Sequence, residues 1–330
     1  MNHNPPLTGN LPVTLNTIDD ARRRIANIAY RTPLYFSPRL SALTNANVYL
    51  KLENYQPIRV FKVRGAANKI LKLSAEERKR GLIAASSGNH GLAVSYLAKI
   101  VHTEATIVVP TSAVAEKVNA IKEYGAKVVR YGLFHDERFN KAIEIQKTTG
   151  AVMIPPFDDP DVIAGQGTVG LEICEDLPDV NTVVVPIGGG GLISGISIAI
   201  RSLKPAVRVI GVEPEKASSM YQSIKNGKVT RLADTTSIAD GLSAREPGVL
   251  TYEAVKRNVD EILLVSENEI EKGVFTAMSE CHLVVEPSAA ASLAALSEKA
   301  RLRAGEKVVV VVSGGNISLK MISRILSKYA

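Results

Sequence analysis

Four consecutive glycines, Gly188, Gly189, Gly190 and Gly191, form the turn of this sequence best suited to binding an anion. Backbone N–H groups without side chains at the start of a helix attract anions, and the helix dipole adds to the attraction. A flexible turn is the alternative, but ordering four glycines costs considerable chain entropy. The run lacks the Lys and Ser/Thr of a P-loop and lies too late for the first βα unit of a dinucleotide domain. We therefore predict a phosphate-binding turn of another kind.

A second polar turn follows the β-branched run Leu82–Ala85 and reads Ser86-Ser87-Gly88-Asn89-His90. Its two hydroxyls and its backbone N–H groups at a helix start could hold a carboxylate. Simple N-capping by Ser or Asn is the alternative, but a cap needs only one such residue. A third turn, Ser313-Gly-Gly-Asn316, follows a run of five valines.

Lys62 is the candidate nucleophile, because it lies between apolar residues in Val60-Phe-Lys-Val63. Apolar surroundings disfavour the charged ammonium and so free the amine for attack on a carbon centre. Many such lysines are instead amphipathic helix residues whose ammonium reaches water. Other catalytic patterns are absent: the five histidines show no metal-binding spacing, and there is no G-x-S-x-G elbow.

Elements that could position these turns recur along the chain as short β-branched runs separated by amphipathic stretches of helical length. This alternation predicts parallel α/β sheets covered by helices, with ligands bound beyond the carboxyl ends of the strands. Capping boxes at Thr17–Asp20 and Ser74–Glu77 predict two of the helices, the first reaching about Ala29. The predicted strands are Val48–Glu53, Leu82–Ala85, Thr106–Val109, Lys127–Arg130, Val152–Ile154, Thr182–Ile187, Val207–Val212 and Lys307–Val312.

Composition narrows the class of protein. The 330 residues suggest about two domains, and the net charge of +7 comes from bases interspersed with acids. With no basic block and few aromatic residues, we expect no nucleic-acid partner. No apolar run approaches the length of a membrane span, and no secretory signal is visible. Two cysteines outside any C-x-x-C pair favour a reducing compartment, so we expect a cytoplasmic protein without a membrane partner.

Taken together and in order, these motifs resemble the fold-type II, pyridoxal-phosphate-dependent serine/threonine dehydratase (threonine ammonia-lyase) and serine racemase family. The resemblance runs from about Thr32 to Asn316 and matches the short form, without a C-terminal regulatory domain. The motifs that carry it are Lys51-Leu-Glu-Asn54, Phe61-Lys-Val-Arg-Gly-Ala66, Ser87-Gly-Asn-His90, Ala164-Gly-Gln-Gly-Thr168, Gly188–Gly191, Gly211-Val-Glu-Pro214, Ala239-Asp-Gly241, Val285-Glu-Pro287 and Ser313–Asn316.

The resemblance implies an α/β fold of the tryptophan synthase β type. Two open twisted sheets would carry helices on both faces, with the active site in the cleft between two domains. Residues 1–53 and 155–330 would form a large cofactor-binding domain, and residues 54–154 a small substrate-loop domain. A homodimer is the family expectation.

Residue roles also follow from the resemblance. Lys62 would hold pyridoxal phosphate as a Schiff base and remove the substrate α-proton. Phe61 would pack beside the ring, Asn89 would hydrogen-bond its 3-oxygen, and Ser313 would face the pyridine nitrogen. Gly188 to Gly191 would cradle the phosphate.

The substrate side of the site would be built from the turn Ser86, Ser87, Gly88, Asn89 and His90, holding the carboxylate of an amino acid. A hydroxyl beside the pyridine nitrogen keeps the ring largely neutral, which makes it a weaker electron sink. We therefore expect β-elimination of a 3-hydroxy-amino acid, L-threonine or L-serine, to a 2-oxo acid and ammonia.

Other activities stay open within the family. Ser87 matches the position where racemising members place an acid/base opposite Lys62, so serine racemase is an alternative. Arg138 could accept a β-carboxylate, as in a 3-hydroxyaspartate ammonia-lyase, or could be an ordinary surface arginine. The segment Ile154–Asp158 departs from the commoner His-Pro-Phe, which admits a hydroxyectoine-pathway role. A catalytically silent binding or scaffold protein of the same fold is the non-enzyme alternative.

Two departures from the family pattern bear on the site. Arg59 and Val60 stand where the family commonly has Gly and a small polar residue, which puts phosphate contacts from this segment in question. Serine racemase-like members hold a divalent cation through Glu, a backbone carbonyl and Asp; here Glu213 and Ala217 match, but Ser219 replaces the Asp. Loss of a carboxylate ligand weakens a Mg²⁺ or Ca²⁺ site, so a metal at Glu213 is only a minor expectation.

Overall fold

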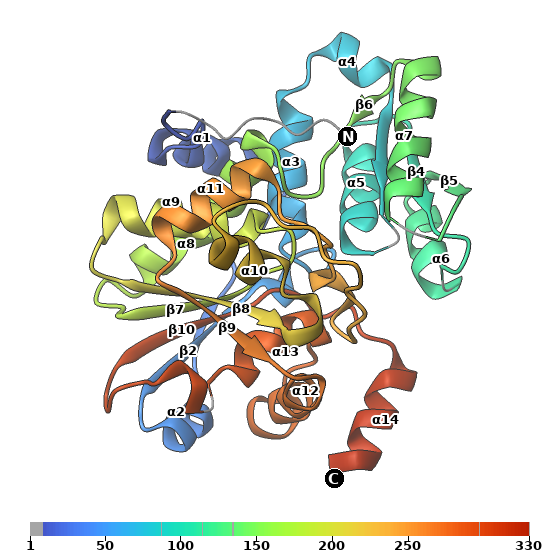
Figure 1. Ribbon diagram of the computed structural model, residues 1–330. Helices are drawn as coiled ribbons and strands as arrows, with labels where there is room; N and C mark the ends of the chain where they lie inside the picture. The colour runs from blue at the N-terminus through green and yellow to red at the C-terminus, as the bar shows by residue number, and fades with distance from the viewer. Residues whose placement is uncertain (1–8, 87, 114, 134, 297, 330) are drawn as a thin grey trace.

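The computed structural model describes residues 9–86, 88–113, 115–133, 135–296 and 298–329, and its strands form two separate sheets (Figure 1). The larger sheet has six strands in the order β1-β2-β10-β7-β8-β9. All its neighbours pair in parallel except β1 and β2. The strands are β1 (Leu34–Phe36), β2 (Asn47–Leu52), β10 (Lys307–Val312), β7 (Thr182–Pro186), β8 (Arg208–Pro214) and β9 (Glu261–Val265).

The smaller sheet has four parallel strands in the order β5-β4-β3-β6. Helices α5 and α6 pack against one side of it and α7 against β3, β4 and β6. Figure 1 shows this unit at the upper right, beside the larger sheet. Its strands are β5 (Lys127–Arg130), β4 (Ala105–Val109), β3 (Leu82–Ala85) and β6 (Val152–Met153).

The valine strand β10 shows why the larger sheet is covered on both faces. Val308, Val310 and Val312 pack into the core formed with α12 and α13, whereas Val309 and Val311 pack with the residues of α9. Successive side chains of a strand point to opposite faces, so an unbroken apolar run requires a hydrophobic layer on each side. All five valines are fully buried, as predicted from the run.

The helices lie mainly between strands in the chain, as in the predicted alternation. Helices α8 and α9 pack on each other, and α13 packs on β7, β8 and β10. The helices are α1 (Leu15–Ile25), α2 (Pro38–Thr44), α3 (Lys62–Lys72), α4 (Ala75–Lys79), α5 (Asn89–Ile100), α6 (Ala115–Glu123), α7 (His135–Thr149), α8 (Pro160–Asp176), α9 (Gly191–Leu203), α10 (Ser219–Asn226), α11 (Val249–Asn258), α12 (Glu267–Cys281), α13 (Pro287–Ala294) and α14 (Leu319–Tyr329).

One predicted helix start is wrong. Thr14, not Thr17, is the N-cap of α1; Thr17 is the third helical residue and its side chain returns a hydrogen bond to the backbone N–H of Thr14. The helix ends at Ile25 rather than near Ala29. The capping box at Ser74 is confirmed, with reciprocal bonds between Ser74 and Glu77.

The eight predicted strands all form; three have the predicted ends, and the ends of the others differ by at most two residues. Two strands, β1 and β9, were not predicted. The first has three residues, too few to show a period, and the second is a half-buried edge strand. The smaller sheet lies within residues 54–154, but the domain boundaries themselves stay a prediction. In the part of the chain that the structure describes, no helix combines the length and apolar character needed to cross a membrane.

Candidate active site

The glycine turn lies between β7 and α9, at the carboxyl end of a fully buried strand. Gly190 is the N-cap of α9 with φ of 94°, a left-handed conformation that favours glycine. It provides no side-chain cap, so the first N–H groups of this 13-residue helix are left for another partner. This is the anion-binding arrangement that the sequence predicts.

Close packing explains why all four positions of this turn are glycine. A Cβ on Gly188 would lie 2.8 Å from the carbonyl oxygen of Gly241, and one on Gly190 would lie 2.7 Å from the Cε of Met220. A Cβ on Gly189 would overlap the ring of Phe157. The turn is therefore held by its neighbours in one conformation, which contradicts a flexible linker.

Lys62 is the first residue of α3 and is partly buried beside the Phe61 ring, with the Nζ 5.2 Å from the ring centroid. Its Nζ donates a hydrogen bond of 2.6 Å to the carbonyl oxygen of Pro156. Burial lowers the pKa of Lys62 to about 8, against the opposing charge of Glu286. The amine is thus available as a nucleophile and base close to neutral pH.

The segment Ile154–Asp158 connects Lys62 with the glycine turn. Pro156 binds the lysine, and the next residue, Phe157, packs against Gly189. Asp158 accepts the backbone N–H groups of Val249, Leu250 and Thr251 at the start of α11. The Thr251 hydroxyl in turn donates to the carbonyl oxygen of Gly189 at 2.7 Å. A few adjacent residues therefore fix the amine and the anion turn relative to each other.

The acidic group Asp158, Asp159 and Asp161 has structural roles. Asp158 caps α11, Asp159 is the N-cap of α8, and Asp161 pairs with Lys69 and Lys72 of α3. No group of three or more metal-ligating side chains with suitable geometry occurs among the residues that the structure describes. Each of the three carboxylates is thus held by a helix start or by lysines of α3.

His90 is buried and its Nε2 lies 2.7 Å from the carbonyl oxygen of Ile154. Because a carbonyl only accepts, Nε2 carries the proton. Burial, with a further contribution from the charge of Lys62, lowers the pKa of His90 to about 3. The imidazole is therefore neutral and positions the start of α5 instead of transferring protons.

The turn before α5 matches part of the predicted carboxylate site. Gly88 is the N-cap of α5 without a side-chain cap, and a Cβ there would meet no atom within 4 Å. The backbone N–H of Gly88 donates to the Ser86 hydroxyl at 3.3 Å. Ser87, the predicted second acid/base, lies outside the described residues. The start of α5 therefore borders open space at Gly88, and no side chain of a described residue caps it.

Asn89 joins three turns through its amide. Its Nδ2 donates to Glu286 Oε1 at 2.7 Å and Oε2 at 3.0 Å, and its Oδ1 accepts from Asn316 Nδ2 at 2.8 Å. Glu286 is buried, and burial raises its pKa to about 7, opposed by the bond from Asn89. Glu286 and Asn316 belong to motifs noted in the sequence, but their roles were missed because neither position shows a partner until the chain folds.

Ser313 lies beside the segment that precedes Lys62. It is buried at the end of β10, and its carbonyl oxygen accepts the backbone N–H of Phe61 at 3.1 Å. Val60 forms a backbone bridge with Gly314, and the carbonyl oxygen of Arg59 accepts from Gly315. The residues before Lys62 are therefore paired with the turn after β10.

Arg59 and Val60 adapt to this pairing in different ways. Arg59 is exposed and has φ of 59°, in the left-handed region where the family pattern has glycine. Val60 is fully buried and packs in the core of the smaller unit. The arginine side chain thus points to solvent, and the valine is a core residue.

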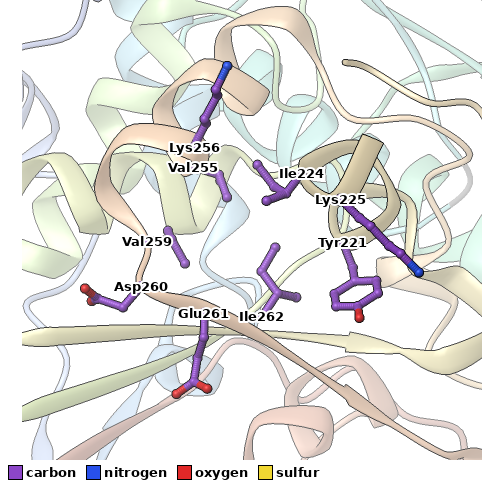
Figure 2. A pocket seen from close by; sticks show the side chains of 9 residues that line it. All are labelled: Tyr221, Ile224, Lys225, Val255, Lys256, Val259, Asp260, Glu261 and Ile262. Atoms are coloured by element: carbon purple, nitrogen blue, oxygen red, sulfur yellow. The ribbon is translucent and has the colours of Figure 1, made fainter. Parts of the chain in front are cut away.

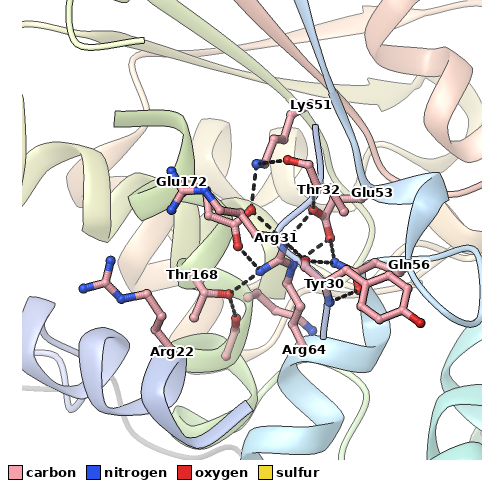
Figure 3. Close-up of polar contacts among 12 residues, drawn as sticks. Arg22, Tyr30, Arg31, Thr32, Lys51, Glu53, Gln56, Arg64, Thr168 and Glu172 are labelled. Carbon is pink, nitrogen blue, oxygen red and sulfur yellow. Dashed lines mark hydrogen bonds and ion pairs between the residues drawn. The ribbon is translucent and has the colours of Figure 1, made fainter. Parts of the chain in front are cut away.

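A buried ion cluster lies beneath the first turn of α3 (Figure 3). Arg64 donates to Glu53 at 2.8 Å and to Glu172 at 2.6 Å, and Lys51 Nζ lies 2.6 Å from Glu172. Arg64 also donates to Thr168 and to the Tyr30 carbonyl oxygen, so its polar atoms are satisfied. Lys51 Nζ also lies 3.5 Å from Asp176, and these ion pairs fix α3, and Lys62 with it, to β2 and α8.

The structure does not join Arg138 to the candidate site around Lys62 and Asn89. Its Nη1 donates to the Leu133 carbonyl oxygen at 2.9 Å, and its Nε has no partner among the described residues. Burial lowers its pKa. No hydrogen bond or ion pair in the described chain joins it to Lys62 or Asn89, so its substrate role stays a prediction.

Glu213, the predicted metal ligand, lies at the start of α10. Its carboxylate accepts the backbone N–H groups of Met220 at 2.9 Å and Tyr221 at 2.7 Å. Ala217 is fully buried nearby, and Ser219 Oγ has no partner in the described part of the chain. Burial raises the pKa of Glu213 to about 8. The metal at Glu213 stays a prediction.

A cavity of about 190 Å³ lies elsewhere, between α10, α11 and β9 (Figure 2). Apolar side chains such as Ile224, Val255 and Ile262 line it, and none of the predicted site residues does. The two ammonium groups at its edge, on Lys225 and Lys256, point away from its centre in Figure 2.

Comparison with known proteins agrees with this geometry. The family model described as "Pyridoxal-phosphate dependent enzyme" matches residues 25–314. The L-threonine ammonia-lyase of Thermotoga maritima is 48% identical over 96% of this chain and 79% of that protein. The catabolic L-threonine dehydratase TdcB of Escherichia coli K12 is 41% identical over 97% of this chain and 98% of its own.

Solved structures show the same fold. Maize serine racemase superposes with a TM-score of 0.91 at 36% identity, covering 96% of this chain and 98% of that one. The processed form of threonine deaminase isoform 2 from Solanum lycopersicum has a TM-score of 0.90 at 32% identity, covering 100% of this chain and 94% of that one. The predicted fold class and cofactor are confirmed, and this chain belongs to the pyridoxal-phosphate dependent enzymes.

Proposed function

We propose that this protein is an L-threonine ammonia-lyase, which converts the amino acid to a 2-oxo acid and ammonia by β-elimination. The observation that carries the proposal is a pair of contacts from adjacent residues: Lys62 donates to Pro156, and Phe157 packs against the glycine turn. The relatives named L-threonine ammonia-lyase and dehydratase, matched over nearly the whole chain, confirm the predicted ammonia-lyase class and favour threonine as substrate.

The residues present fit pyridoxal phosphate. The uncapped start of α9, with no room for any Cβ, suits a phosphate, and Lys62 supplies the amine that would carry the cofactor. Ser313 and Asn89 would face the ring at its nitrogen and its 3-oxygen, as the family resemblance assigns them. When bound, this cofactor withdraws electrons from the substrate α-carbon and so makes its C–H bond acidic.

The protein's own groups supply binding and proton transfer. The start of α5, with Gly88 at its N-cap, would hold the substrate carboxylate. Lys62 would take the α-proton, because its lowered pKa makes the free amine available near neutral pH. The neutral His90 keeps α5 in place through Ile154 and transfers no proton.

Racemisation of serine is the second candidate, supported by the likeness to maize serine racemase. It needs a second acid/base opposite Lys62, the role predicted for Ser87. Selectivity for 3-hydroxyaspartate would instead depend on Arg138.

A substrate panel tests these functions on protein loaded with pyridoxal phosphate. L-threonine, L-serine, D-serine and threo-3-hydroxyaspartate are each assayed for oxo acid release and for enantiomer conversion. We expect fastest oxo acid release from L-threonine. D-serine formed faster than oxo acid from L-serine, or a preference for hydroxyaspartate, would replace the proposed activity by its rival.

Lys62→Ala should abolish turnover, by at least about a thousandfold, while the protein stays folded. Lys72→Ala is the matched control, because this lysine lies on the same helix but is exposed and pairs with Asp161. The control should retain wild-type turnover. Full activity of Lys62→Ala would refute the mechanism, and the visible absorbance of the bound cofactor should disappear in that variant alone.

We also infer a homodimer and a cytoplasmic location. Cys174 and Cys281 are buried free thiols. Burial raises the pKa of both thiols, that of Cys174 to about 11, so neither readily forms the thiolate that is oxidised. The dimer rests on the family resemblance, and light scattering of the purified protein tests it.

A further inference from the structure

Glu286 occupies the N-cap of α13, yet its side chain makes no hydrogen bond to its own helix. A residue at this position ordinarily satisfies the free N–H groups of the first turn. Here only the backbone oxygen of Glu286 takes part, accepting from Ala289 and Ala290. The carboxylate is 95% buried and turns to the amide of Asn89 on α5. Its orientation therefore serves a contact outside its own helix.

The direction of the Asn89 amide is determined from both ends. Asn316 Nδ2 lies 3.1 Å from the backbone oxygen of Ile58, which can only accept, so this atom is a donor. The same amino group donates to Asn89 Oδ1. On the other side, a carboxylate accepts from Asn89 Nδ2. The amide therefore presents its oxygen to Asn316 and its amino group to Glu286.

The turn after β10 is shaped to admit the carboxylate. A Cβ on Gly314 would overlap Glu286 Oε1, so a larger residue would push the carboxylate away from Asn89. The backbone N–H of Glu286 also donates to the carbonyl oxygen of Gly314 at 3.1 Å. This turn begins with Ser313, whose carbonyl oxygen accepts the backbone N–H of Phe61, the residue before Lys62.

We propose that Glu286 is a positioning residue that holds the Asn89 amide with its amino group toward the cofactor ring. The proposal rests on the function proposed above, in which Asn89 donates to the ring 3-oxygen. The Glu286 carboxylate faces one side of this amino group, with its two oxygens 2.7 and 3.0 Å from Asn89 Nδ2. An amino group has two N–H bonds, so one N–H shared between these oxygens leaves the second to donate to the cofactor. Without Glu286, only the bond from Asn316 opposes a turn of the amide that would present its oxygen, which cannot donate.

The affinity of the protein for pyridoxal phosphate tests this role independently of turnover. Apo protein is titrated with the cofactor, and binding is followed by its visible absorbance. Glu286→Ala should weaken binding roughly tenfold, because one buried hydrogen-bonding partner is lost. Glu286→Gln should stay within about threefold of wild type, since its amide oxygen still accepts from Asn89.

Non-additivity shows that Glu286 acts through Asn89. The double variant Glu286→Ala/Asn89→Ala should bind pyridoxal phosphate as weakly as Asn89→Ala alone. Both single variants should also shift the absorbance of the bound cofactor in the same direction. Glu271→Ala is the matched control: this residue is also buried, on the neighbouring α12, and its carboxylate pairs with Arg324 and Lys328. It should leave cofactor affinity unchanged.

Asn316→Asp gives a second route if Glu286→Ala does not fold. An aspartate cannot donate to Asn89 Oδ1, so it favours the reversed amide and should also weaken cofactor binding by roughly tenfold. Additive losses in the double variant, or wild-type affinity in both folded Glu286→Ala and Asn316→Asp, would overturn the proposal. Wild-type protein that binds no pyridoxal phosphate, or releases no oxo acid, would instead count against the proposed function.

Discussion

At the scale of single residues, burial determines the chemistry of the site. Lys62 and Glu286 are each desolvated by burial, which lowers the pKa of the lysine to about 8 and raises that of the carboxyl to about 7. His90 is held neutral by the same burial and by the charge of Lys62. Desolvation thus brings the pKa values of both the Lys62 amine and the Glu286 carboxyl close to neutral pH.

The rate at which apo protein takes up pyridoxal phosphate should follow the free amine of Lys62. Below its pKa the amine is protonated, so the rate should rise by about tenfold per pH unit and level off above pH about 8. Stopped-flow absorbance at a series of pH values measures this. A rate that keeps rising toward the ordinary lysine pKa of 10.5 would contradict the lowered value.

At the scale of elements, the site is a set of turns held by pairing between turns. The segment before Lys62 pairs with the turn after β10, and that turn contacts Glu286 and, through Asn316, Asn89. This pairing requires the chain to reverse at Arg59, which adopts a left-handed conformation that costs an L-residue about 1–2 kcal/mol. Because the Arg59 side chain is exposed, this cost comes from the backbone conformation of the turn and not from side-chain packing.

Arg59→Gly should raise the free energy of unfolding by about 0.5 kcal/mol. Glycine removes the left-handed strain, and its greater freedom in the unfolded chain offsets part of the gain. Arg301, with φ of 46°, is the matched control elsewhere in the chain, and Arg301→Gly should change stability in the same direction. Urea unfolding measures both. A loss of stability in Arg59→Gly with a gain in Arg301→Gly would show that Arg59 makes a specific contact.

At the scale of the whole molecule, ion pairs connect the two sheet units across the site. Lys117 of α6 pairs with Asp240, and Arg231 pairs with Asp136 of α7. Asp240 precedes Gly241, whose carbonyl oxygen packs against Gly188 of the glycine turn. Both pairs are partly exposed, so each contributes little to stability and weakens with salt. They can bias the relative position of the two units instead.

Lys117→Ala should lower the free energy of unfolding by less than about 1 kcal/mol but raise KM by roughly twofold to fivefold. The change should also reduce the salt dependence of KM, because the screened pair is gone. Lys127→Ala is the control, since its pair with Glu104 lies within the smaller unit and is more exposed. If Lys117→Ala and Lys127→Ala changed KM equally, an ion pair that joins the two sheet units would matter no more than one within the smaller unit.

The sequence by itself determined the strands, the glycine turn and the candidate lysine, because these depend on local pattern. Period-two and β-branched runs predict strands from neighbouring residues alone, and a glycine run after a strand predicts an anion turn. The strands β1 and β9 were not predicted, because few residues of a short or edge strand show its pattern. Thr14 was missed as a cap because two threonines at the right spacing compete.

Only the tertiary structure decided which side chains meet. Glu286, Asn89 and Asn316 lie on three separate turns, and their contacts span up to 227 positions of sequence. Asp158 became a helix cap, and Glu213 another, once α11 and α10 were placed beside them. Burial sets the pKa values of Lys62 and Glu286, and burial depends on the packing of distant segments. Long-range packing, which no local pattern encodes, therefore turned separate motifs into one site.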